Sequence, residues 1–170
     1  MHTKKLVLST AMYFVAAACF ANPTSSFTDE TKAVEQATAQ FYTSLNTMFT
    51  GDAGPMQEIW SHADDVTYMG PAGEFQVGWN EVRDIWQAQA ALNLGGKVEP
   101  YEMRVTVGDD LAFTQCYEKG TNLDAQGRTV QVSIRATNLF RKESGKWKMI
   151  GHHTDLLPFL EKQTFTKSAE

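Results

Sequence analysis

The C-terminal half of the sequence carries four strand-like segments in a row, and this series limits the fold most strongly. The segments cover residues 98–107, 111–120, 128–141 and 146–155, and short turns containing Gly and Asp or Ser separate them. Short runs of alternating polar and apolar residues with such turns between them are typical of antiparallel hairpins. We therefore expect a four-stranded antiparallel meander.

Three helical segments come before this meander. Apolar residues recur at helical spacing over residues 28–50 and 79–92, and a shorter helix is expected from Pro55 to about His62. A short hairpin over residues 64–78 lies between the second and third helices. Helices and strands that are segregated along the chain predict an α+β domain, with three N-terminal helices packed on a mainly antiparallel sheet.

The N-terminus is expected to be a secretory signal peptide. Lys4 and Lys5 precede an apolar run over residues 6–20, and small residues then lead to Ala21 and a proline-containing break. This order is typical of a signal peptide, here cleaved after Ala21. The run is shorter than the about 20 residues that a membrane-spanning helix needs. A retained anchor and a lipoprotein processed at Cys19 are the alternatives.

The chain is thus expected to have four parts: a signal peptide over residues 1–21, a flexible lead-in over 22–27, one domain over 28–157 and a tail over 158–170. The mature protein would be periplasmic or secreted, without a membrane span. Its net charge would go from −5 to −7 because two lysines leave with the signal peptide. An acidic chain without a basic cluster lacks the attraction for phosphates that nucleic-acid binding requires, so we expect no nucleic-acid partner.

The last hairpin supplies the candidate site. At a two-residue period, Arg135 and Thr137 share one face of its first strand, and His153 and Asp155 share one face of its second. An imidazole beside a carboxylate can act as a general base, and an arginine can hold an anionic group of a substrate. We expect His153 and Asp155 as catalytic residues, and Arg135 and Thr137 as substrate-binding residues on the polar floor of an apolar cavity. The alternative is structural, with His153 bonded locally and Arg135 paired with Asp155.

Aromatic residues are candidates for the wall of that cavity. Tyr68, Trp60, Trp86 and Tyr117 are the substrate-binding candidates, although aromatic side chains at such positions also build cores. A metal site is not expected, because His152 points to the opposite face of its strand from its neighbour and the histidines are few. We expect no cofactor.

The order of elements and several motifs resemble the nuclear transport factor 2-like superfamily, and within it the SnoaL-like group. The motifs are His62-Ala-Asp-Asp65, Gly70-Pro-Ala-Gly73, Arg135-x-Thr137, and Gly145-Lys-Trp147 followed by His153. The resemblance covers residues 28–157 and implies a curved sheet wrapped around a long helix, forming a cone with an internal pocket. It does not specify a function, because this fold hosts isomerases, cyclases, dehydratases and modules without chemistry.

The resemblance to the ketosteroid isomerase branch ends at the catalytic positions. The base of that branch precedes the proline of the turn, where this sequence has Gly70 before Pro71. The protonated aspartate of that branch would fall on Thr137, and its tyrosine near Ser44, two residues from Tyr42. Because glycine cannot accept a proton, an isomerase of that mechanism is not expected.

Two functions stay open. The first is an exported SnoaL-like domain that binds a small, partly apolar molecule in its internal pocket, with acid–base chemistry by His153 and Asp155. The second is a non-catalytic association module, because Gly145-Lys-Trp147 and His153 also resemble the calcium/calmodulin-dependent kinase association domain. Family members are commonly dimers, so the resemblance implies a homodimer.

Overall fold

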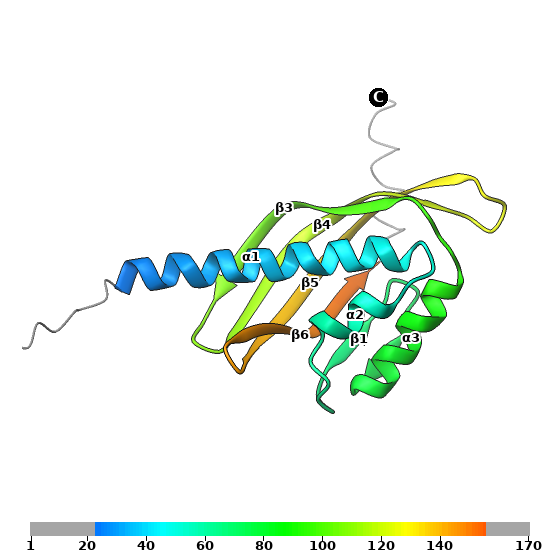
Figure 1. Ribbon diagram of the computed structural model, residues 1–170. Helices are drawn as coiled ribbons and strands as arrows, with labels where there is room; N and C mark the ends of the chain where they lie inside the picture. Colours follow the sequence, from blue (N-terminus) through cyan, green and yellow to red (C-terminus); the bar gives the residue numbers. More distant parts are fainter. Residues whose placement is uncertain (1–22, 156–170) are drawn as a thin grey trace, which may run out of the picture.

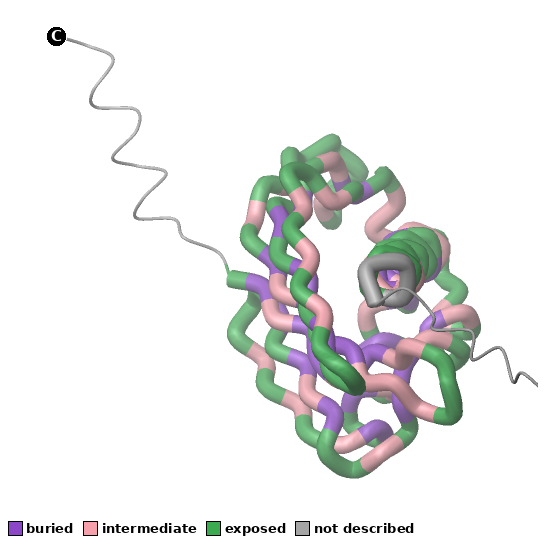
Figure 2. The backbone as a smooth tube through the Cα atoms, turned by 90° about the vertical axis from the view of Figure 1, so that its left-hand side faces the viewer, coloured by how far each residue is buried: buried purple, intermediate pink, exposed green. Residues whose placement is uncertain are grey.

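A long helix, α1 (Pro23–Met48), lies across one face of a curved sheet in the computed structural model, which describes residues 23–155 (Figure 1). In the view along α1, the sheet curls around one side of the helix (Figure 2). The expected signal peptide, Cys19 and the tail over residues 158–170 lie outside the described residues. Among residues 23–155, no helix is both long and apolar enough to cross a membrane.

Two shorter helices, α2 (Gly54–Ile59) and α3 (Trp79–Ala91), complete the helical layer. Both begin and end within a few residues of the predicted bounds. The first helix differs more, because α1 begins at Pro23 and residues 23–27 of the expected flexible lead-in are helical. Proline is compatible with the first turn of a helix, where its missing N–H has no intrahelical partner.

The sheet has six strands in the order β2-β1-β6-β5-β4-β3. All neighbours are antiparallel except β1 and β6, which are parallel. This arrangement confirms the predicted α+β class, the meander and the short earlier hairpin. The strands are β1 (Thr67–Met69), β2 (Phe75–Val77), β3 (Lys97–Val107), β4 (Leu111–Leu123), β5 (Thr129–Glu143) and β6 (Lys146–Asp155).

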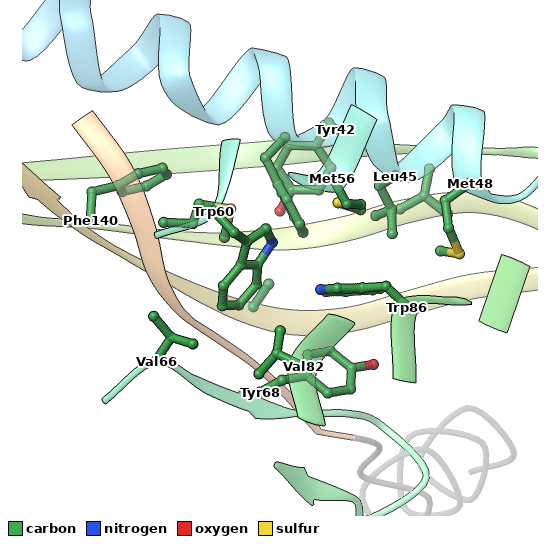
Figure 3. Close-up of a cluster of buried hydrophobic side chains, with 14 of the residues drawn as sticks. Tyr42, Leu45, Met48, Met56, Trp60, Val66, Tyr68, Val82, Trp86 and Phe140 are labelled. Carbon is green, nitrogen blue, oxygen red and sulfur yellow. The ribbon is translucent and has the colours of Figure 1, made fainter. Parts of the chain in front are cut away.

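The core lies between the helices and the inner face of the sheet. Residues spaced three or four apart on α1, Phe41, Leu45 and Met48, are buried, as the amphipathic pattern predicts. The indoles of Trp60 and Trp86 lie 6.0 Å apart between ring centroids and are fully buried (Figure 3). Trp60, a candidate for the cavity wall, is therefore a core residue that supports Trp86.

A β-bulge in β6 decides which side chains face the core. Phe140 of β5 pairs with Met149, but the preceding Leu139 pairs with Gly151, so Ile150 is an extra residue on β6. Side chains alternate between the two faces of a strand, and one extra residue reverses the alternation. Met149 before the bulge is buried on the inner face, and so is His152 after it.

The bulge corrects a prediction made from the sequence. An uninterrupted two-residue period placed His153 and Asp155 on the face of Met149, which is the inner face. Because the bulge reverses the alternation, both lie on the outer face together with their register partners Thr137 and Arg135. The expectation that these four residues form the floor of an internal cavity was wrong.

Candidate functional site

An internal cavity of about 380 Å³ lies between the inner face of the sheet and helices α1 and α3. Its walls are mainly apolar, with Trp86, Leu45 and Val98 among them, and its polar residues include Glu118 and His152. Among the described residues, the lining contains one carboxyl group and no lysine or arginine. The lining residues are Leu45, Phe49, Tyr68, Pro71, Ala72, Trp86, Gln89, Leu94, Val98, Glu118, Asn122, Gln131, Val132, Ser133, Ile134, His152 and Thr154.

Glu118 brings a carboxyl group into this cavity from the inner face of β4. The residue is only 4% exposed. The hydroxyl of Tyr42 on α1 donates a 3.1 Å hydrogen bond to its Oε1 atom and lies 3.1 Å from the thiol of Cys116. Burial raises the pKa of Glu118 to about 7, although the Tyr42 hydrogen bond opposes the increase. Near neutral pH, Glu118 is therefore present in both its protonated and its ionised form.

His152 brings an imidazole to the same region from β6. Its Nδ1 atom lies 2.6 Å from Oδ1 of Asn138, whose amide nitrogen donates to the hydroxyl groups of Tyr42 and Thr114. Because the Asn138 oxygen can only accept, Nδ1 of His152 carries the hydrogen and Nε2 carries a lone pair. That Nε2 atom is 3.7 Å from Oε1 of Glu118. Burial lowers the pKa of His152 to about 3, so the ring is neutral at physiological pH.

Tyr68 of β1 adds a hydroxyl group to the lining, next to the turn that follows that strand. Its hydroxyl accepts a 2.6 Å hydrogen bond from the amide of Gln89 on α3. A Cβ atom at Gly70 would lie 2.6 Å from this hydroxyl and 2.7 Å from the Oε2 atom of Glu74. A side chain at this position, which carries the base in the ketosteroid isomerase branch, would therefore require Tyr68 or Glu74 to move.

The residues expected at the site from the sequence divide between two places. Tyr68 and Trp86 line the internal cavity. Five others gather around a separate depression on the outer face of the sheet, where Nε2 of His153 lies 2.9 Å from Oδ2 of Asp155. The structure thus brings these five together, but outside the cavity, and their functional roles stay predictions. The five are Tyr117, Arg135, Thr137, His153 and Asp155.

The outer face also carries exposed apolar side chains and charges of both signs. Phe113, Tyr117 and Leu139 are each about two-fifths exposed. Arg135 and Asp155 line the same depression as Glu102 and Arg104. A face of this composition differs from the cavity, whose only charged side chain among the described residues is a carboxyl.

Sequence reasoning missed the buried polar group of Tyr42, Glu118, Asn138 and His152. One signal was present: Ala112, Thr114, Cys116 and Glu118 alternate along β4, and a glutamate on an otherwise small and uncharged face is unusual. The partners come from α1, β5 and β6 and could not be paired with Glu118 without the fold. No three His, Cys, Asp or Glu side chains of residues 23–155 are grouped as metal ligands would be.

Comparison with known families gives one match over most of the chain. The sequence model of a family described as a SnoaL-like domain matches residues 34–156. Among curated proteins, the chain is 26% identical over 102 residues to the F-box protein SKIP8 of Arabidopsis thaliana. This match covers 60% of the chain and 41% of the plant protein, so the chain spans about two-fifths of that protein's length.

Solved structures share the fold. A candidate dehydratase of the NTF2-like family from Streptomyces avermitilis superposes with a TM-score of 0.67 at 24% identity, covering 76% of this chain and 97% of that one. A candidate calcium/calmodulin-dependent protein kinase type II association domain from Thiobacillus denitrificans gives 0.60 at 21% identity, covering 72% and 94%. At this identity the two structures establish a common fold and nothing about activity.

Proposed function

Because the chain belongs to the SnoaL-like domain family, we propose that it binds a small, partly apolar molecule in its internal cavity. The observation that carries this proposal is the cavity itself. Its volume of about 380 Å³ is in the range of small-molecule sites, and apolar walls surround a few buried polar groups. Glu118 and His152 are the groups that would orient a ligand there, because both are buried and both line the cavity.

The catalytic role predicted for His153 and Asp155 remains a separate proposal. Both side chains lie on the outer face, so this role requires a substrate that binds outside the cavity. Replacing His153 with Ala should then abolish turnover, whereas chemistry within the cavity should respond to changes at His152. The two adjacent histidines therefore form a matched pair for any assay of activity.

Export is also part of the proposal. It rests on the basic residues, the apolar run and the small residues that precede Asn22. N-terminal sequencing of the protein purified from its own host would test it. A mature chain that begins at Asn22 supports export with cleavage after Ala21, and a retained Met1 contradicts it.

Native mass spectrometry of the mature protein, purified gently from its own host, tests cavity binding directly. A stoichiometric organic molecule that leaves the protein on unfolding is the expected result. The control is a variant in which Val132, a half-buried lining residue of β5, is replaced by Trp to fill part of the space. Retention of the same molecule by this variant would show that it binds elsewhere.

A second candidate function is association through the outer face of the sheet. Exposed Phe113, Tyr117 and Leu139 provide apolar area there, and Arg135 and Asp155 provide both signs of charge. A symmetric homodimer places the same surface on both sides of its interface, so a face with both signs can be complementary to itself. A chain that is monomeric at micromolar concentration by analytical ultracentrifugation would exclude this function.

A further inference from the structure

Two hydrogen-bond acceptors face each other at the polar end of the cavity, and no group of residues 23–155 donates to both of them. Nε2 of His152 carries a lone pair, because Nδ1 donates to Asn138. Oε1 of Glu118 lies 3.7 Å away, which is too long for a direct hydrogen bond. A single nitrogen with two or more hydrogens can donate to both atoms across such a distance.

The same region has no positively charged side chain among residues 23–155. In that part of the chain the cavity lining contains one carboxyl group and no lysine or arginine. Tyr42 donates to Oε1 of Glu118 and so favours the ionised form of the carboxyl group. A buried carboxylate is stable only when it is paired and hydrogen-bonded, and the protein supplies the hydrogen bond without the cation.

Other groups of the lining suit a cation with an apolar body. The hydroxyl of Thr154, which follows His152 on the inner face of β6, is buried and has no hydrogen-bond partner among the described residues. It can therefore act as a third acceptor. The aromatic rings of Tyr68 and Trp86 also line the cavity, and such rings attract cations through their faces.

We propose that the ligand of this cavity carries a protonated amine, which binds between Glu118 and His152 while its apolar part packs against Trp86. This inference rests on the proposed function, because it names the chemical class of the molecule that the cavity binds. It excludes a carboxylate or phosphate ligand at this end, since either would place a second negative charge beside Glu118.

The proposal has a defined pH dependence. Burial raises the pKa of the Glu118 carboxyl group to about 7. Below that pH the carboxyl group holds a proton, which must leave before the group can pair with a cation. The affinity for an amine should therefore fall about tenfold for each pH unit below about 7. Above about 7 it should stay level until the amine itself loses its proton.

Isothermal titration calorimetry with three probes of similar size and shape tests the inference. The probes are phenethylamine, its hydrocarbon analogue propylbenzene, and the neutral ketone benzylacetone, each titrated into the full mature chain. At about pH 8 we expect the amine to bind at least about tenfold more tightly than either neutral probe. Glu118→Gln should remove this preference without abolishing the binding of propylbenzene. Glu99→Gln, at an exposed position on β3, is the matched control.

The possible results separate the inference from the function on which it rests. If propylbenzene or benzylacetone binds as tightly as the amine, or if the affinity for the amine rises as the pH falls, the cavity binds ligands but not through a cation. If none of the three probes binds and no molecule is retained in native mass spectrometry, both the inference and the proposed function fail. The pH series on the wild-type protein decides the matter even if Glu118→Gln does not fold.

Discussion

The side chains of Asn138 and His152 form a 2.6 Å hydrogen bond that determines which imidazole nitrogen faces Glu118. Asn138 is fully buried, and its amide nitrogen also donates to Tyr42 of α1 and Thr114 of β4. One amide thus fixes the orientation of the three side chains around it. The polar group at the cavity is therefore organised by the sheet and α1 before any ligand binds.

The protonation state of His152 can be read directly by NMR. We expect its nitrogen signals to show a neutral ring with the hydrogen on Nδ1 throughout about pH 5 to 8, because burial lowers its pKa to about 3. Long-range ¹H–¹⁵N spectra of the imidazole nitrogens make this measurement. His153, which is half-exposed on the outer face, is the internal comparison. Titration of His152 near its ordinary value of 6.5 would contradict the burial that we describe.

Replacing Asn138 with Ala should destabilise the protein strongly. The change leaves buried groups of His152 and Thr114 without their partner, whereas Tyr42 keeps its hydrogen bond to Glu118, and each unsatisfied buried group costs about 1–3 kcal/mol. We expect a loss of about 3 kcal/mol in the free energy of unfolding, measured by urea denaturation. Asn80→Ala at an exposed position on α3 should change it by less than about 0.5 kcal/mol. Equal losses of unfolding free energy in the two variants would show that the buried Asn138 amide does not stabilise the fold more than an exposed one does.

The sequence predicted the elements of this fold far better than the residues of its cavity. Helical spacing and turn residues were sufficient for all three helices and all four strands of the meander, because each signal is local. The site depends on a single extra residue, Ile150, which reverses the faces of β6. As a result, His152 and not His153 faces the cavity. Nothing in the local pattern marks that bulge. The partners of Glu118 come from α1 and β6, and only the folded sheet brings them together.

The buried carboxyl group of Glu118 should make stability depend on pH. Its pKa in the folded protein, about 7, is above its ordinary value of 4.5. Between these values the folded protein holds a proton that the unfolded chain has lost, so stability falls as the pH rises through this range and levels above about 7. Glu118→Gln removes this decline. Its stability relative to wild type should increase by up to about 3 kcal/mol from about pH 4.5 to 7, and a constant difference in urea denaturation would contradict the raised pKa.

A methyl group at Gly70 should disturb the wall of the cavity. It would lie 2.6 Å from the hydroxyl of Tyr68 and 2.7 Å from Oε2 of Glu74, so at least one side chain must move. We expect Gly70→Ala to cost about 1–3 kcal/mol in thermal unfolding, as overpacking does elsewhere. In a Tyr68→Phe background the same substitution should cost less, because the hydroxyl that it meets is gone. An equal cost in both backgrounds would place the strain elsewhere.

Association through the outer face should depend on its apolar side chains. Leu139 is about two-fifths exposed and lies over Gly151 of β6, near the middle of the outer face. A lysine there would place a charge within the proposed interface, where burying it without a partner is costly. We expect Leu139→Lys to convert a dimer into a monomer in analytical ultracentrifugation, with thermal stability measured alongside to exclude unfolding.

Leu92→Lys, at the C-terminal end of α3, is the control, because it replaces an even more exposed leucine and should leave the dimer intact. If both variants or neither become monomeric, the outer face is not the interface. Because Leu139 lies outside the cavity, its replacement should leave ligand binding unchanged, which separates the two candidate functions within a single protein.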